Sequence, residues 1–417
     1  MTENGTRRRT VEPPRPRAIV LVVSTAAFAH QHSRLSEARL RGDGSSRVDT
    51  LTGMRAVAAL AVCVNHAAFW AGGFTADWRG SAFARLEVAV PFFFVLSGFL
   101  LFRPWVTTAR SAGPAQAGGP APSVRRYLTH RAWRVLPAYW TVITVVYLIY
   151  TVRVDLNSSG RGYGGYLRHM LFIQVYGPGH VKDGLTQTWS MCVEVVFYLA
   201  LPLFGWLLLR LCRTGFRVWR ALGMLAVVGA CSLGWVAFTC GTDVLNQTAR
   251  VWPPTYAVCL AAGMALALVP AGRRIPTVAV WGCVATAAAI YALLLTRLVG
   301  PIDLARPTAV QGAAKLGLEA AFGAAVVAAA AFSSGRGVAS RLLAVRPMVW
   351  LGDISYEYYM IHVMALDIVV RNIFHWHLFS GNTVAIVVVT SAITVPLSWA
   401  LHRSVLWLRA NMRRHTA

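Results

Sequence analysis

The chain has 417 residues, of which 56% are hydrophobic and only 13% are charged, and its formal net charge is +24 at pH 7. About a quarter of the residues in a soluble globular domain are charged, so this composition excludes that class and predicts a protein that crosses a membrane many times. The basic residues are spread over short loops without a nucleic-acid-binding motif, which excludes nucleic acid as a partner. The seven cysteines form no CxxC pair, so neither a metal site nor a disulfide framework is expected.

The N-terminal segment, residues 1–50, is rich in arginine and proline and is predicted to be a mostly disordered cytoplasmic tail. An alternative is a cleaved signal peptide, because a basic start, an apolar run of about twelve residues and Ala27-Phe28-Ala29 imitate one. Cleavage would place several arginines outside the cell, against the usual excess of basic residues on the cytoplasmic side. The tail is therefore the preferred interpretation.

Ten apolar segments follow the tail, each close to the roughly 20 residues that an α-helix needs to cross a bilayer while satisfying its own backbone hydrogen bonds. They are expected near residues 51–72, 88–107, 132–152, 188–209, 218–240, 253–270, 276–297, 311–334, 347–370 and 383–408. The predicted fold class is all-α, a polytopic membrane helix bundle of about ten transmembrane helices over residues 51–410, with a short basic tail over 411–417.

The distribution of arginine predicts the orientation, because cytoplasmic loops hold most of the Lys and Arg residues of a membrane protein. With both termini cytoplasmic, the cytoplasmic segments hold 28 basic residues and the external loops hold 10, while Arg55 and Lys315 lie within spans. The sequence thus predicts a multi-pass protein of the inner (plasma) membrane, surrounded by lipid, with both termini cytoplasmic.

The first span contains two ionisable residues, Arg55 near its cytoplasmic end and His66 eleven residues later. At 1.5 Å per residue they lie about 16 Å apart along the helix, and eleven steps of about 100° return the side chains to the same face. An arginine at this edge is also typical of an interface anchor whose head reaches the water. A histidine inside a membrane more often marks a pathway or a site.

Other ionisable groups are expected within the membrane. Glu194 lies some 9 Å below the outer surface on its own span, at the depth of His66, so a contact between this carboxylate and the imidazole is expected. His362 reaches a similar depth on the ninth span, where a packing histidine bound to a carbonyl is the alternative to a functional one. Lys315 and Glu319 are four residues apart on one helix and are expected to neutralise each other.

Five stretches of the chain carry a resemblance to a known family. They read "RVDTLTGMRAVAALAVCVNH", "VPFFFVLSGFLLFRPW", "RRYLTHRAWRVLPAYW", "QTWSMCVEVVFYLALPL" and "WLGDISYEYYMIH". In this order and spacing they resemble the family-three membrane acyltransferases of bacteria, over about residues 48–410. The resemblance implies transfer of an acyl group, often acetyl from acetyl-CoA, to a hydroxyl of a surface polysaccharide, a glycolipid or a macrolide.

The resemblance also implies which residues are functional. The family's Arg-x10-His signature falls on Arg55 and His66, its Trp-Ser-…-Glu motif on Trp189, Ser190 and Glu194, its Arg-x-x-Arg-x-x-Pro on Arg131, Arg134 and Pro137, and its Ser-Tyr…His on Ser355, Tyr356 and His362. Two positions depart from the family. Cys192 stands where serine is common, and the last helix reads His402-Arg403-Ser404 where an acidic-basic-proline triplet is usual.

Acyl transfer needs a base, since a hydroxyl attacks a thioester poorly until its proton is removed, and a neutral imidazole suits that task. His66 is therefore expected to be the general base, with Glu194 fixing its ring. Arginines bind phosphate well, so the CoA phosphates are assigned to the cytoplasmic arginines. The predicted donor- and substrate-binding residues are Arg55, Arg131, Arg134, Ser190, Tyr356 and His362, with Arg103 as a further candidate. Acyl-CoA is the donor substrate, and no permanently bound cofactor or metal is expected.

Two other classes of protein share some of these features. A transporter or flippase of glycans or lipids would also show ten spans and charges within the membrane, but no inverted repeat or pair of broken helices is evident. A sensor that has lost catalysis would have no need for the shared face of Arg55 and His66. The enzyme is the preferred interpretation, and the acceptor and the acyl length stay open.

Overall fold

The computed structural model describes residues 44–111, 122–152, 160, 162–212, 215–302, 305–335 and 337–415. Within these ranges the chain is helical, with short 3₁₀ segments, one π-helical turn and loops, and without a strand, which confirms the all-α fold class. Most of the predicted N-terminal tail, including Ala27-Phe28-Ala29, lies outside the described residues. The helices described below belong to the unit Ser46–Ala417, apart from the first two residues of α2.

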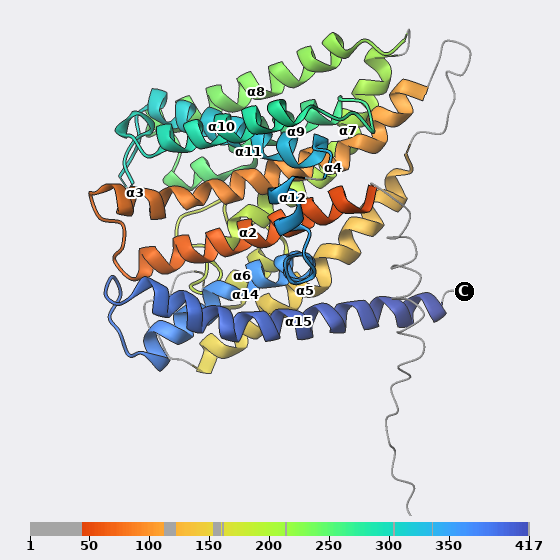
Figure 1. Ribbon diagram of the computed structural model, residues 1–417. Coiled ribbons are helices and arrows are strands. Elements are labelled where there is room, and N and C mark those ends of the chain that lie inside the picture. Colours follow the sequence, from red (N-terminus) through yellow and green to blue (C-terminus); the bar gives the residue numbers. More distant parts are fainter. Residues whose placement is uncertain are drawn as a thin grey trace, which may run out of the picture. The chain divides into compact units, whose positions relative to one another are not determined.

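Within the described residues, eight helical segments are long and apolar enough to cross a membrane. They are built from α2 (Gly44–Trp70), α3 (Trp78–Arg85) continued through η1 (Leu86–Val88) into α4 (Ala89–Ser111), α5 (Val124–Val152), η2 (Thr186–Thr188) with α7 (Trp189–Leu211), α8 (Val218–Gly241), α10 (Thr277–Leu294), α11 (Ala309–Phe332) and α15 (Thr383–His415). Figure 1 shows most of these long helices running roughly alongside one another. They correspond to eight of the ten predicted spans.

The predicted spans 253–270 and 347–370 differ, because each is divided into shorter pieces. The first consists of η4 (Pro253–Tyr256) and the eleven-residue helix α9 (Ala257–Ala267). Two consecutive prolines start this segment, and proline lacks the backbone N–H that an α-helix interior requires. Its apolar residues are buried by protein, as in a core helix, so hydropathy alone overestimated its length.

The second divided segment consists of α13 (Arg346–Asp353), α14 (Ser355–Ile368) and the π-helical turn η6 (Val369–Ile373). The break at Ile354 follows Gly352, where a Cβ would lie 2.0 Å from the carbonyl oxygen of Thr52, so this close approach to α2 requires glycine. Ser355 donates a hydrogen bond to the Gly352 carbonyl at 2.7 Å and caps the interrupted helix.

The interior is formed around α4 and α14. α4 packs against α7, α9 and α11, and the backbones of α4 and α9 meet closely, since a Cβ on Gly263 would lie 1.9 Å from the Val95 carbonyl oxygen. α14 packs against α5, α15 and η2 and is buried along nearly its whole length. The remaining elements are α6 (Gly162–Met170), α12 (Val338–Leu343), η3 (Gln247–Val251) and η5 (Arg297–Val299). The first turn of α14 is therefore held at the junction of α2, α5 and α7, where the candidate site lies.

Candidate active site

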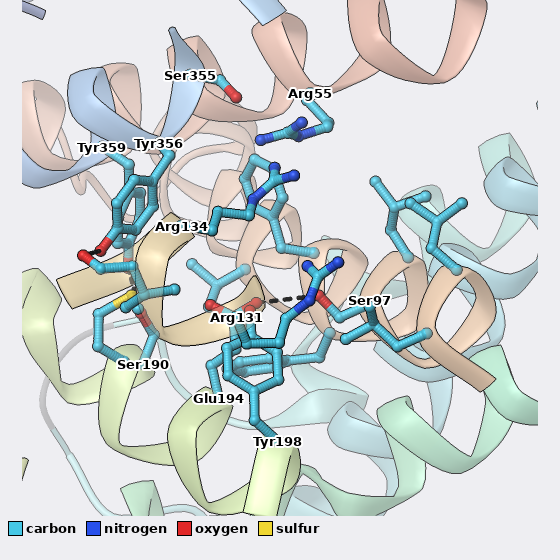
Figure 2. A pocket seen from close by; sticks show the side chains of 18 residues that line it. Arg55, Ser97, Arg131, Arg134, Ser190, Glu194, Tyr198, Ser355, Tyr356 and Tyr359 are labelled. Atoms are coloured by element: carbon cyan, nitrogen blue, oxygen red, sulfur yellow. Dashed lines mark hydrogen bonds between the residues drawn. The ribbon is translucent and has the colours of Figure 1, made fainter. Parts of the chain in front are cut away.

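A cavity of about 220 Å³ lies between α2, α4, α5, α7 and α14 and is lined by 18 residues (Figure 2). Its polar lining residues are Arg55, Ser97, Arg131, Arg134, Ser190, Glu194, Tyr198, Ser355, Tyr356 and Tyr359. Seven of these belong to the motifs singled out from the sequence, and three, Ser97, Tyr198 and Tyr359, do not. We call this cavity the arginine pocket, because three guanidinium groups line it.

Helical periodicity explains how segments far apart in the sequence supply this lining. Residues three or four apart lie on the same face of a helix. Arg131 and Arg134 have that spacing on α5, and Ser190 and Glu194 have it on α7. Arg55 joins them from α2. The Arg-x10-His, Arg-x-x-Arg-x-x-Pro and Trp-Ser…Glu motifs therefore contribute side chains to one cavity.

Hydrogen bonds connect the walls of the arginine pocket. Ser97 on α4 donates to Oε1 of Glu194 at 3.1 Å. The hydroxyls of Ser190 and Tyr359 are 2.9 Å apart, which ties α7 to α14. The Tyr356 hydroxyl donates to the Val135 carbonyl of α5 at 3.1 Å. These contacts fix the side-chain positions around the cavity.

Among the residues that line the arginine pocket, three arginines accompany one carboxylate, Glu194, while the carboxylates of Asp353 and Glu357 lie near Arg55 outside the lining. Arg131 Nε is buried and has no hydrogen-bond partner within the described part of the chain, although its guanidinium lies over the Tyr198 ring at 6.0 Å. A buried donor without a partner costs free energy unless a ligand or water satisfies it. The pocket is therefore suited to an anion of more than one charge, such as a phosphate.

The two predicted histidines do not line the arginine pocket. Nδ1 of His66 lies 2.9 Å from Nε2 of His362, and Nδ1 of His362 lies 2.7 Å from the Tyr359 carbonyl oxygen. The expected contact between His66 and Glu194 is wrong, because Glu194 faces Ser97 in the pocket instead. The physical reason is that depth along a helix sets the height of a side chain and leaves open which way it points around the axis.

Tyr359 connects the histidines to the arginine pocket. Its hydroxyl contacts Ser190 inside the pocket, while its backbone carbonyl contacts His362. No role was predicted from the sequence for Tyr359, Ser97 or Tyr198. The signal for Ser97 was present, because it is a lone hydroxyl within the apolar run "FFFVLSGFLL". Tyr359 and Tyr198 could not be distinguished from packing aromatics by sequence alone.

The C-terminal departure from the family pattern has a structural partner. His402 on α15 lies with Nδ1 2.9 Å from Oε1 of Glu357, which is 5% exposed and sits next to Tyr356 on α14. This contact ties the last helix to the element that carries Tyr356 and Tyr359. The residue at position 402 thus contributes to the support of the site.

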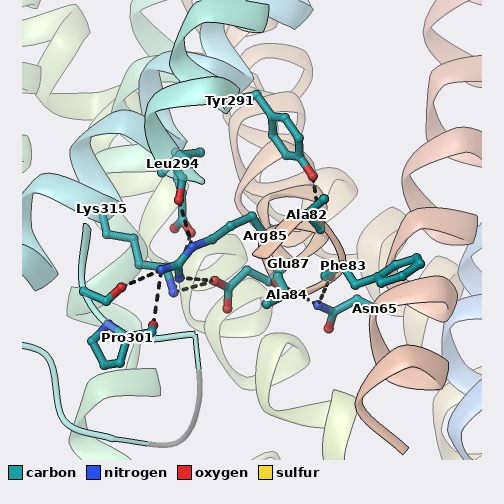
Figure 3. Close-up of polar contacts among 12 residues, drawn as sticks. Asn65, Ala82, Phe83, Ala84, Arg85, Glu87, Tyr291, Leu294, Pro301 and Lys315 are labelled. Carbon is teal, nitrogen blue, oxygen red and sulfur yellow. Dashed lines mark hydrogen bonds and ion pairs between the residues drawn. The ribbon is translucent and has the colours of Figure 1, made fainter. Parts of the chain in front are cut away.

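A second charged group lies elsewhere, around Arg85, and we call it the ion cluster (Figure 3). Nζ of Lys315 lies 2.6 Å from Oε1 of Glu87 and 4.0 Å from Oε1 of Glu319. The predicted ion pair of Lys315 with Glu319 is therefore present, but the ion pair with Glu87 is shorter. Arg85 lies 3.2 Å from Glu87. Its guanidinium also donates to the carbonyls of Leu294, Gly300 and Pro301.

A family model described as "Acyltransferase domain" matches residues 48–403. The chain is 27% identical over 340 residues to the peptidoglycan O-acetyltransferase OatA of Listeria monocytogenes, covering 76% of this chain and 49% of the relative. It is 25% identical over 339 residues to the acyltransferase MdmB of Streptomyces mycarofaciens, covering 77% and 79%.

A third relative is the putative peptidoglycan O-acetyltransferase YrhL of Bacillus subtilis, to which the chain is 28% identical over 353 residues, covering 79% of this chain and 51% of the relative. The chain therefore spans about half the length of two of these three relatives. No solved structure matches it.

Proposed function

Since the chain belongs to the family-three acyltransferases, which are integral membrane enzymes, we propose that it transfers an acyl group, acetyl from acetyl-CoA, to a hydroxyl of a cell-envelope glycan, a glycolipid or a macrolide-type acceptor. Membership of the family confirms the resemblance seen in the five sequence motifs. The observation that carries the proposal is the convergence of Arg55, Arg131 and Arg134 with Glu194 on one cavity. A glycan acceptor agrees with the names of two relatives, a peptidoglycan O-acetyltransferase and a putative one.

The arginine pocket is proposed to hold the phosphates of the acyl-CoA. Three guanidinium groups offer planar, bidentate donors that match phosphate oxygens. A bound phosphate would also accept a hydrogen bond from the buried Nε of Arg131, which has no partner in the described chain. With Glu194 counted, the lining residues carry a formal net charge of +2, which is complementary to the phosphates of CoA.

His66 is proposed as the general base. It lies on the same face of α2 as Arg55, about 16 Å farther along the helix, a distance that suits a donor whose charged phosphates and thioester lie at opposite ends of a long pantetheine arm. The acceptor oxygen attacks the thioester carbonyl carbon while His66 takes the hydroxyl proton. The carbon–sulfur bond then breaks, and the proton passes to the departing CoA sulfur.

We infer the orientation of the donor site, with the arginine pocket nearer the cytoplasm than His66, from the positive-inside rule, which supports ten crossings with both termini cytoplasmic. The eight long helices provide eight of these crossings, and the divided segments around α9 and α14 provide the other two. The arginine pocket then opens toward the cytoplasm, where acyl-CoA is available. A transporter or flippase was the alternative from sequence, and the divided segments around α9 and α14 are a feature that transporters share. The family match favours the enzyme.

Radiolabelled acetyl-CoA and purified protein in detergent test the proposal. With peptidoglycan fragments or a macrolide as acceptor, the label should move to the acceptor. His66→Ala should lower the rate by about 10²–10⁴-fold, the usual contribution of a positioned base. The control is His169→Ala, which removes another buried histidine far from α2 in sequence. Equal transfer by the wild type and His66→Ala would contradict the role of His66.

A further inference from the structure

His66 and His362 form an unusual pair of imidazole rings, one from α2 and one from α14. Their facing nitrogens are 2.9 Å apart, their ring planes differ by only 8°, and their centroids are 5.1 Å apart. The centroid separation exceeds the nitrogen separation by about one ring diameter, so the two nitrogens lie close to the line between the ring centres. This is the geometry of an N–H···N hydrogen bond between the ring edges.

The direction of that hydrogen bond follows from the other end of the pair. A backbone carbonyl can only accept a hydrogen bond, so Nδ1 of His362, at 2.7 Å from the Tyr359 carbonyl oxygen, must carry a proton. In a neutral imidazole the other nitrogen is then an acceptor. Nε2 of His362 therefore accepts, and the donor is Nδ1 of His66.

We propose that His362 is a positioning residue that holds His66 in the Nδ1–H tautomer and leaves Nε2 of His66 as the proton acceptor. This inference rests on the proposed function, in which His66 is the base. It replaces Glu194, the partner expected from sequence, by an imidazole and a backbone carbonyl. The arrangement follows the general logic of a nucleophile or base that is oriented by a second group, which is itself oriented by a third.

Burial supports this division of roles. His362 is fully buried, and the Tyr358 ring lies nearly parallel to it at 6.1 Å between centroids. His66, by contrast, is partly exposed. Next to it, the Asn65 amide donates to the carbonyls of Phe83 and Ala84 at 2.9 Å each and fixes this turn of α2. A buried partner is thus placed to orient a partly exposed base.

The pair would also act during the reaction. When Nε2 of His66 takes the acceptor proton, the ring becomes a cation and its Nδ1–H becomes a stronger donor. Nε2 of His362 already lies in place to accept that bond, so no reorganisation is needed as the charge develops. Tyr359 couples this pair to the donor site, because its hydroxyl contacts Ser190 in the arginine pocket.

The direct test is ¹⁵N NMR of the full-length protein in detergent, labelled at its histidine nitrogens, because protonated and unprotonated ring nitrogens differ widely in chemical shift. His66→Gln assigns the His66 signals. At neutral pH we expect a protonated Nδ1 and an unprotonated Nε2 for His66. A proton on Nε2 of His66 in the wild type would overturn the proposal, whether or not an acceptor for transfer has been found.

Variants of His362 separate positioning from general support. His362→Gln keeps an acceptor close to the place of Nε2, whereas His362→Leu removes it. We expect His362→Leu to lower kcat by more than about tenfold, within the contribution of a positioned base, with KM for acyl-CoA nearly unchanged, and His362→Gln to restore part of kcat. Equal kcat in the two variants would overturn the proposal. His169→Gln, at a buried histidine bound to the Gly165 carbonyl, should leave the His66 tautomer as it is.

Discussion

The two clusters of charged residues within the helices differ in how their charge is balanced. In the ion cluster, two cations (Arg85 and Lys315) face two carboxylates (Glu87 and Glu319), and the Arg85 guanidinium is satisfied by carbonyls. In the arginine pocket, three arginines face one carboxylate around a cavity. The formal charges of the ion cluster cancel, whereas the residues that line the arginine pocket carry a formal net charge of +2.

This difference separates charged residues that join helices from charged residues that are proposed to bind a ligand. Burying a charge is costly unless it is paired, so a balanced, hydrogen-bonded cluster is expected to join elements. Arg85 does this by connecting α3 to the loop that follows α10. An unbalanced group of like charges beside a cavity is instead a site that a ligand of opposite charge completes.

The largest expected effect concerns which loops lie outside the cell and which lie in the cytoplasm. In a variant without native cysteines, a membrane-impermeant maleimide applied to intact cells should modify a cysteine at Val244, which is 75% exposed in the loop after α8, and not one at Ser123, just before α5. The positive-inside rule places these loops on opposite faces. The reverse labelling would put the arginine pocket on the external side and separate it from cytoplasmic acyl-CoA.

The next effect concerns the ion cluster. Arg85→Leu should lower the free energy of unfolding in detergent by about 2–6 kcal/mol, because the buried carbonyls of Leu294 and Gly300 lose their hydrogen bonds to the guanidinium. The folded fraction should bind CoA with unchanged affinity. Arg79→Leu, on the same helix and exposed, is the matched control and should change stability by less than about 0.5 kcal/mol. Loss of CoA binding by folded Arg85→Leu would remove the contrast between the clusters.

In the arginine pocket, loss of an arginine should weaken CoA binding and leave stability unchanged, the opposite of the result expected for the ion cluster. Arg131→Met should raise the Kd for CoA by about 10–150-fold, since a charge-assisted hydrogen bond is worth about 1.5–3 kcal/mol. Stability should not fall, because the variant removes a buried donor that has no partner in the described chain. Isothermal titration calorimetry gives the affinity. Arg126→Met, exposed on the same helix, should leave it unchanged, and a destabilised Arg131→Met with normal affinity would indicate a structural arginine.

A smaller effect is expected for Ser97→Ala. The hydroxyl donates to Glu194 at 3.1 Å, but Glu194 is half-buried and borders a cavity, so water can replace the lost donor. The affinity for CoA should change by less than about 1 kcal/mol. A loss as large as that of Arg131→Met would show that the Ser97–Glu194 contact organises the arginines.

The sequence predicted the all-α class and all eight long helices, because the length of an apolar segment can be read directly from its hydropathy. Hydropathy did not predict the breaks in the segments around α9 and α14. The apolar residues of these segments are largely buried within the protein. Hydropathy does not separate burial in protein from contact with lipid. The breaks depend on local features, such as the close approach of Gly352 to α2, that only the packed structure reveals.

The site was predictable where helical periodicity applies within one segment. The spacing of Arg131 and Arg134, and of Ser190 and Glu194, puts each pair on one face, and the structure brings both faces to the same cavity. Contacts between helices were less accessible, since they depend on rotation about the helix axis. For that reason His66 was assigned to Glu194, while the structure pairs it with His362.

The most direct test of the central claim is the affinity of CoA for the wild type and for Arg55→Ala, Arg55→Lys and His66→Ala, measured by calorimetry on purified protein in detergent. If Arg55 binds a CoA phosphate, Arg55→Ala should weaken binding by about 1.5–3 kcal/mol, the usual value of a charge-assisted bond. Arg55→Lys should recover only part of that loss, because an ammonium lacks the planar fork, and His66→Ala should bind nearly as well as the wild type. Unchanged affinity in Arg55→Ala would contradict the claim and leave the arginine as an interface anchor.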